Sequence, residues 1–260
     1  MTGARLGSYR LGDRSELLVE HLLTSVAFTT RVPRQEDVGI DFVCILITNH
    51  DANNLLWAGP TFTVQAKSAA KPIVYEKAHE LAWIRNQENP LLVCVGNRDS
   101  LSMDIYSTWN LVPAVLAGWR GQKEPIRMVL RPGESCDEWP GLINNDDGSQ
   151  EILLGKPIAH VTSEDIFNDG RVEALVHTIE PWIAIDRLNI VNRHAGLDFV
   201  IGPQTYETNR PLGPERAVSF YWHPKNLPKA TNNFGLSATA LWRVLHHDQI
   251  ASATDVTKPP

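Results

Sequence analysis

The sequence has few cysteines, lacks a long apolar run and carries no excess of positive charge, and each absence excludes a class of protein. Its three cysteines have no metal-type spacing, which argues against a zinc-stapled domain. No apolar run reaches the roughly 18 residues that a membrane span needs, so we expect no membrane segment. The first ten residues also lack the apolar core of a signal peptide. We therefore expect a protein of a reducing, cytoplasmic compartment.

The net charge of −6 argues against a protein that coats nucleic acid unaided. The charge is uneven, because residues 1–130 are neutral overall and residues 131–260 carry the whole excess of acid. We expect the acidic half to bind a protein partner or a second copy of the chain, not a duplex. Basic surface must then be local, and its candidates are Arg5, Arg10, Arg14, Arg31, Arg34, Lys67, Lys71 and Lys77.

Several familiar catalytic signatures are also missing. The sequence has no Gly-x-x-x-x-Gly-Lys-Ser/Thr phosphate loop and no Gly-x-Ser-x-Gly elbow. The pair His246-His247 has no cysteine or carboxylate at ligand spacing, which favours a surface pair over a metal site. The tryptophans of the second half, Trp182, Trp222 and Trp242, are candidates for base stacking, although core packing is the more common use.

Hydrophobic periodicity predicts a mixed α/β core followed by a less regular extension. We expect helices over residues 11–26, 77–86 and 109–119, and strands over residues 27–33, 40–48, 61–68, 91–95, 104–107 and 127–130. A polar connection is expected over residues 49–60. Free thiols at Cys44 and Cys94 fall inside predicted strands, where they pack as small hydrophobes.

The clearest loop, residues 131–150, predicts a boundary between a core of residues 1–130 and an extension of residues 151–260. We expect this extension to be mainly helical and irregular. Thr162 or Ser163 would cap a helix that runs towards Glu180, and Pro181 would kink it or start another. A last helix is expected over residues 236–250.

Two strand-like runs carry the residues with the most chemical meaning. Asp41 opens the apolar run at Phe42, and Gln65 and Lys67 lie in the run that ends near Ser68. Side chains alternate across a strand, so Gln65 and Lys67 point to one face. If the two strands pair, a carboxylate, an amide oxygen and an ammonium converge at one end of a sheet. That set suits a divalent cation beside a phosphate.

This order of helix, strand, Asp-bearing strand and Gln-x-Lys strand resembles the PD-(D/E)XK nuclease superfamily, over about residues 8–115. The segment Gly12-Asp13-Arg14-Ser15-Glu16 supplies a helix-borne carboxylate where many members carry one. Gln-x-Lys replaces the usual Glu-x-Lys, as in Mrr-like enzymes. The segments Glu36-Asp37-Val38-Gly39-Ile40-Asp41 and Val64-Gln65-Ala66-Lys67-Ser68 look like a branch catalogued only as a domain of unknown function. Members of that branch act as effector nucleases in prokaryotic antiviral defence.

The resemblance implies a restriction-endonuclease-like mixed central sheet flanked by helices, and a metal-dependent endonuclease. Asp41 would be the central ligand of Mg²⁺ or Mn²⁺, with Glu16, the Gln65 amide oxygen and the Ala66 carbonyl as further ligands. Lys67 would orient the attacking water or offset charge on the phosphate. Each residue also has a plainer interpretation: a Gly-x-Asp turn, an exposed helix glutamate at Glu16, or a lysine that snorkels at a strand end.

Two hypotheses of different class follow. The first is a nuclease that hydrolyses phosphodiester bonds in DNA, or also in RNA, and acts in antiviral defence; a toxin that cuts transfer RNA is a variant of it. The second is a catalytically inactive subunit that keeps the nuclease fold for nucleic-acid binding or complex assembly. The neutral Gln65 and the acidic balance of the chain favour the second.

Overall fold

The chain is a mixed α/β protein, as predicted. The computed structural model describes residues 7–33, 39–49, 56–109, 111, 126–134, 142–195, 199–201 and 218–220. Within these stretches the helices are α1 (Gly7–Leu23), α2 (Ala78–Arg85) and α4 (Asp169–Ala195), with a 3-10 turn η2 (Asp165–Phe167) before the last.

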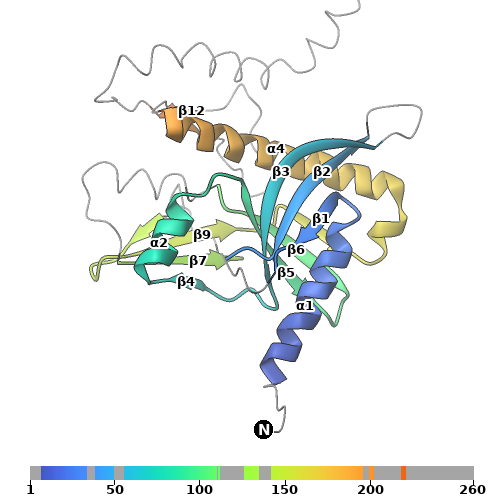
Figure 1. Ribbon diagram of the computed structural model, residues 1–260, viewed down its shortest axis with the longest axis horizontal. Coiled ribbons are helices and arrows are strands. Elements are labelled where there is room, and N and C mark those ends of the chain that lie inside the picture. Colours follow the sequence, from blue (N-terminus) through green and yellow to red (C-terminus); the bar gives the residue numbers. More distant parts are fainter. Residues whose placement is uncertain are drawn as a thin grey trace, which may run out of the picture.

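The described strands form three sheets (Figure 1). The six-stranded sheet contains, in spatial order, β1 (Ala27–Arg31), β2 (Phe42–Asn49), β3 (Leu56–Lys67), β5 (Leu91–Asn97), β6 (Ser102–Ser107) and β10 (Ala159–Thr162). The four-stranded sheet contains β4 (Ile73–Tyr75), β7 (Arg127–Pro132), β9 (Ser149–Gly155) and β8 (Leu142–Asn144). A small pair consists of β11 (Phe199–Ile201) and β12 (Val218–Phe220).

The six-stranded sheet is antiparallel except for one pair. β2 and β3 form a hairpin with Phe42 opposite Val64, whereas β3 and β5 run parallel with Gln65 opposite Val93. A parallel pair needs a crossover connection. The segment that contains β4 and α2 provides it, and so carries these two elements over one face of the sheet.

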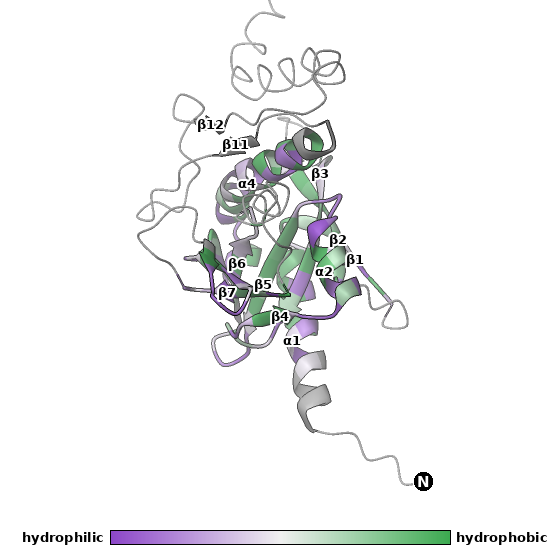
Figure 2. Ribbon diagram, turned by 90° about the vertical axis from the view of Figure 1, so that its left-hand side faces the viewer, coloured by the Kyte–Doolittle hydropathy of each residue, from purple (hydrophilic) through white to green (hydrophobic). Residues whose placement is uncertain are grey.

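Two hydrophobic clusters fill the space on either side of this sheet. The first lies against α1 and α4 and includes Leu22, Val64 and Trp182. The second lies against α2 and the four-stranded sheet and includes Val93 and Met128. Figure 2 shows the central strands coloured mostly as hydrophobic, in keeping with their position between the two clusters. Side chains on β3 therefore belong to one cluster or the other by alternation.

Several predicted elements are present with shifted ends. The helix predicted to reach Val26 ends at Leu23, because the Thr24 and Ser25 hydroxyls donate to the carbonyls of His21 and Leu22 and close its last turn. The connection predicted over residues 49–60 is shorter, because β3 begins at Leu56. Pairing with β2 extends to this residue and makes the hairpin long.

The second half differs more from its prediction. Residues 131–150, predicted as a loop, contain β8 and the start of β9. β10 pairs with β6 in the six-stranded sheet, and α4 packs on the same sheet. Residues 151–195 therefore do not form a separate extension, and the predicted boundary falls within paired β-structure. The predictions for residues 236–250, His246-His247, Trp222 and Trp242, and most of the helix over 109–119, lie outside the described residues.

Three predicted packing roles are confirmed. Cys44 and Cys94 are buried free thiols, and Trp182 is buried in the first cluster. Burial raises the pKa of Cys44 to about 12, so this thiol stays protonated and behaves as a small hydrophobe. In the described ranges, no helix has an apolar stretch sufficient to cross a membrane.

The start of α2 carries a pH-sensitive contact. The Glu80 carboxylate accepts hydrogen bonds from the Lys77 ammonium (3.0 Å) and from the backbone N–H groups of Lys77 and Glu76 (3.2 Å each). These contacts lower the pKa of Glu80 from 4.5 to about 2, so their stabilising effect is present above pH 4.5 and is lost as pH falls towards 2.

We expect Glu80→Gln to lower the melting temperature at pH 7, because the variant loses the charge that these donors stabilise. The difference from the wild type should narrow as pH falls below about 4.5. Thermal melts followed by circular dichroism between pH 7 and pH 3 measure it, with the exposed Glu88→Gln as control. A difference that stays constant over this range would contradict the assignment.

Candidate functional site

Asp41 lies directly before β2 and is tied to β3 through both its backbone and its side chain. Its backbone N–H donates to the Val64 carbonyl (2.8 Å), which continues the hairpin ladder by one bond. Its Oδ2 accepts a hydrogen bond from the backbone N–H of Ala66 at 2.7 Å. Before β2 begins, the Asp41 carboxylate therefore accepts the Ala66 N–H, and this bond fixes the position of the carboxylate relative to β3.

The Ala66 carbonyl lies on the same side of β3 as this carboxylate. In a strand, the N–H and C=O of one residue point to the same neighbour. Thr63 donates its N–H to Pro90 on the β5 side, so the backbone groups of Val64 and Ala66 face the β2 side instead. The structure therefore brings Asp41 and Ala66 together, with two kinds of oxygen on one side of the strand.

Gln65 points to the opposite cluster from its two neighbours. Val64 and Ala66 belong to the first cluster, whereas the Gln65 amide oxygen accepts a hydrogen bond from the Tyr75 hydroxyl at 2.9 Å. Both partners are buried, with 7% of Gln65 and 5% of Tyr75 exposed. Asp41 precedes the first register pair of the hairpin, Phe42 with Val64, and it bonds to Val64 and Ala66, the two neighbours of Gln65.

Lys67 is the last residue of β3 and is half-buried. Its register partner on β5, Val95, belongs to the second cluster, as does Val93 opposite Gln65. Alternation therefore puts Lys67 and Gln65 on one face of the sheet, as the sequence predicted. The last three residues of β3 include the Gln65 amide and the Lys67 ammonium, and the Asp41 carboxylate bonds to Ala66 between them.

Glu16 approaches this end of the sheet from the other face. α1 lies against the first cluster, and a Cβ placed on Gly96 would meet the Ser15 carbonyl oxygen at 3.3 Å. Gly96 directly follows Val95, the partner of Lys67. The residue after Ser15 is Glu16, which is half-exposed. The helix-borne carboxylate is thus at the same end of the strands as Lys67, on the helix that covers the opposite face.

Two aromatic side chains that the sequence did not predict, Tyr75 and Trp83, form a wall at the border of the site. Tyr75 lies on β4 and its ring centroid is 6.0 Å from that of Trp83 on α2. Trp83 in turn closes on Gly39, where a Cβ would meet the indole at 3.0 Å. Gly39 has φ +82°, a conformation that favours glycine. The turn that leads into Asp41 therefore rests on α2.

Negative charge gathers around the buried hydroxyl of Tyr75. Burial raises the pKa of Tyr75 well above its usual value, the hydrogen bond to Gln65 lowers it, and the charges of Glu80 and Asp41 raise it further. The pKa of Cys94 is also raised, by burial first and then by the charges of Cys44 and Asp41. The Asp41 carboxylate is thus close enough to affect groups on both faces of the sheet.

The donor set at the end of β3 consists of oxygens. A carboxylate, an amide oxygen and a backbone carbonyl are hard ligands of the kind that Mg²⁺ and Mn²⁺ take in proteins. Among the described residues, no three His, Cys, Asp or Glu side chains gather closely enough to hold a metal ion. A cation here depends on the Gln65 amide and on backbone oxygen.

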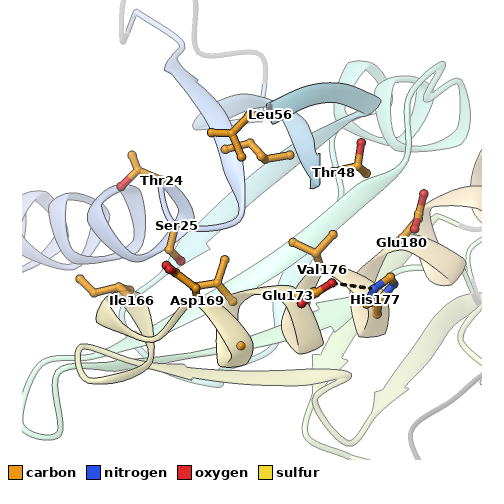
Figure 3. Close-up of a pocket in the computed structure, with 13 residues that line it drawn as sticks. Thr24, Ser25, Thr48, Leu56, Ile166, Asp169, Glu173, Val176, His177 and Glu180 are labelled. Atoms are coloured by element: carbon orange, nitrogen blue, oxygen red, sulfur yellow. Dashed lines mark ion pairs between the residues drawn. The ribbon is translucent and has the colours of Figure 1, made fainter. Parts of the chain in front are cut away.

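A hollow with a volume of about 510 Å³ lies between α4 and the far end of the β2–β3 hairpin. Figure 3 shows Asp169, Glu173 and His177 on α4 and Thr48 on β2 around it. Its lining carries three carboxylates, including Glu180, and no lysine or arginine. Since Thr48 lies seven positions beyond Asp41 along an extended strand, the hollow is about 20 Å from the oxygens described above. Its charge opposes a phosphate backbone.

Comparisons with protein-family models, with curated proteins and with solved structures gave no match.

Proposed function

We propose that this chain is a metal-dependent nuclease with a restriction-endonuclease-like core that hydrolyses phosphodiester bonds in DNA or RNA. One observation carries the proposal. The Asp41 carboxylate accepts a hydrogen bond from the Ala66 N–H at 2.7 Å, next to the buried Gln65, at the strand end that carries Lys67. A carboxylate, an amide oxygen and a backbone carbonyl near an ammonium form a set that suits a divalent cation beside a phosphate.

The residues have distinct roles in this proposal. Asp41, the Gln65 amide oxygen and the Ala66 carbonyl would hold Mg²⁺ or Mn²⁺, with Glu16 as a further carboxylate from α1. When bound, the cation supplies a Lewis acid for the phosphate and lowers the pKa of water. Lys67 would donate a hydrogen bond to the oxygen of the attacking water, or place its positive charge beside the phosphate oxygens. The single charged ligand on the hairpin favours one cation over two.

The wider assignment rests on the family resemblance. It comprises a cytoplasmic effector in prokaryotic antiviral defence, with a protein partner or a second copy bound through the acidic second half. The hollow beside α4 agrees with this division of labour, because its carboxylates disfavour nucleic acid. Function is argued from the site, and the defence role is an analogy.

A second candidate is supported by a specific observation. Gln65 is neutral, and its amide oxygen already accepts the hydrogen bond from the Tyr75 hydroxyl. In the described part of the chain, no three His, Cys, Asp or Glu side chains lie close enough together to hold a metal ion. These features suit a catalytically inactive subunit that binds nucleic acid or assembles a complex. Binding of Mn²⁺ that depends on Asp41 separates the two candidates, because the nuclease requires it and the inactive subunit does not.

The direct test is degradation of a panel of substrates by the wild-type protein. Supercoiled plasmid, linear duplex, single-stranded DNA, structured RNA and transfer RNA are each incubated with Mg²⁺ or Mn²⁺, with and without a chelator. We expect cleavage of at least one substrate and its complete loss on chelation. Cleavage that survives chelation would overturn the proposal. Absence of cleavage of every substrate, when a physiological partner is also present, would overturn it as well.

We expect Gln65→Glu to bind Mn²⁺ about tenfold more tightly, because a carboxylate is a stronger ligand than an amide for a hard cation. Without a cation the same variant should melt at a lower temperature, since the new carboxylate is buried and adjoins Ala66, to which the Asp41 carboxylate bonds. Calorimetric titration and melting curves measure the two effects. The gain in affinity should disappear in the Asp41→Asn background; a gain that persists there would place the cation elsewhere.

A further inference from the structure

The buried pair formed by Tyr75 and Gln65 joins the two larger sheets. Gln65 belongs to the six-stranded sheet and Tyr75 to β4, the edge strand of the four-stranded sheet. The hydroxyl donates to the amide oxygen at 2.9 Å, and at most 7% of either residue is exposed. A buried hydrogen bond of this kind has no competing water, so it fixes the side chain that accepts it.

Tyr75 is itself held from two directions. Its backbone pairs with Met128 on β7, and its ring packs at 6.0 Å from the Trp83 ring, with 31° between the planes. Tyr75, Ile84 and Met128 all belong to the second cluster. The hydroxyl is therefore placed by packing that does not depend on Gln65.

The same wall also holds the turn before Asp41. A Cβ on Gly39 would make a tight contact of 3.0 Å with the Trp83 indole, and Ile40 packs against the second cluster. Asp41 follows directly and is bonded to Ala66. One unit, made of β4 and α2, therefore contacts the segments that carry both Asp41 and Gln65.

We propose that Tyr75 is a positioning residue for cation binding at this site: it fixes the Gln65 amide oxygen while Trp83 fixes the turn into Asp41. The inference rests on the proposed function. It deepens that proposal by naming what orients its weakest ligand. A free glutamine side chain must lose its rotational freedom before it can bind a cation. The Tyr75 hydrogen bond removes that freedom in advance and uses only one of the two lone pairs of the amide oxygen.

The Tyr75 hydroxyl donates its proton in a hydrogen bond to the Gln65 amide oxygen. A neutral hydroxyl donates one hydrogen bond and adds no charge to a site that already contains a carboxylate. This suits a neutral amide ligand, since it orients the oxygen without repelling the cation.

Tyr75→Phe tests the inference, with Tyr106→Phe as matched control, because Tyr106 is a buried tyrosine of the same cluster. Mn²⁺ is titrated into the full chain by calorimetry. We expect Tyr75→Phe to weaken Mn²⁺ binding about three- to tenfold and Tyr106→Phe to leave it unchanged. In a Gln65→Ala background, Tyr75→Phe should have no additional effect, because the tyrosine acts through the glutamine.

A second readout needs no cation. The side-chain amide resonance of Gln65, identified by its loss in Gln65→Ala, should shift in Tyr75→Phe and not in Tyr106→Phe. Unchanged Mn²⁺ affinity in Tyr75→Phe, while Asp41→Asn loses binding, would overturn the positioning role and leave the proposed function intact. An equal effect of Tyr75→Phe with and without Gln65 would overturn it as well. Absence of Asp41-dependent Mn²⁺ binding in the wild type would overturn both.

Discussion

Asp41→Asn is expected to reduce phosphodiester hydrolysis at least about 100-fold, because it removes the charge of the central ligand in the proposed cation site. The substitution is chosen to separate charge from structure. An asparagine oxygen still accepts the hydrogen bond from Ala66 that ties the turn to β3, so the fold is retained. Alanine would lose both the charge and the bond, and a loss of activity would then have two explanations.

The comparison requires cleavage rates at saturating Mg²⁺, Mn²⁺ affinity and a melting curve for each variant. Asp146→Asn is the control, because Asp146 is exposed in the turn between β8 and β9, in the four-stranded sheet. We expect the control to match the wild type in all three measurements. If Asp41→Asn cleaves as fast as the wild type, no active centre exists at the end of β3 and the proposed function is wrong.

The hairpin that carries Asp41 could be predicted because its signal is local. Asp41 precedes an uninterrupted apolar run, and Gln65 and Lys67 alternate with buried residues in the next strand. Two such runs close in sequence pair as a hairpin, and their register starts at Phe42 opposite Val64, which brings Asp41 to the end of β3. Alternation then determines which side chains share a face.

The wall beside the site could not be predicted, because its signal is distant. β4 is only three residues long, too short for a period, and its partner β7 lies more than fifty residues further along the chain. The Tyr75 hydrogen bond to Gln65 exists only when that pairing has formed. β10 was missed for the same reason, since its four residues pair with the distant β6.

α4 shows how tertiary contacts override local signals. The sequence suggested a start at Thr162 or Ser163, but Thr162 instead donates to the Asp165 carboxylate in the preceding turn. Asn168 caps the helix, accepting the Arg171 N–H on its side chain at 3.1 Å.

The helix also runs through Pro181 without ending. A proline in a helix interior costs about 3 kcal/mol. Burial of the next two side chains, Trp182 and Ile183, against the six-stranded sheet contributes a comparable amount, about 1.5–3 kcal/mol for each.

Lys67→Met is expected to lower the cleavage rate about 100-fold while Mn²⁺ binds as well as before. Methionine keeps much of the apolar stem that packs at the end of β3 and removes only the ammonium. Removing a positive charge near the cation does not weaken the attraction between the cation and Asp41. Affinity and rate should therefore separate, whereas Asp41→Asn is expected to lower both.

This separation also tests the plainer interpretation of Lys67, in which the side chain only snorkels to solvent at a strand end. In that case Lys67→Met cleaves at the wild-type rate, like the control Lys156→Met in the exposed turn between β9 and β10. Single-turnover rates with the substrate found in the panel, together with Mn²⁺ titrations, distinguish these results. A variant that loses Mn²⁺ binding as well would assign Lys67 to the structure of the strand end, because an ammonium has no lone pair to offer a metal.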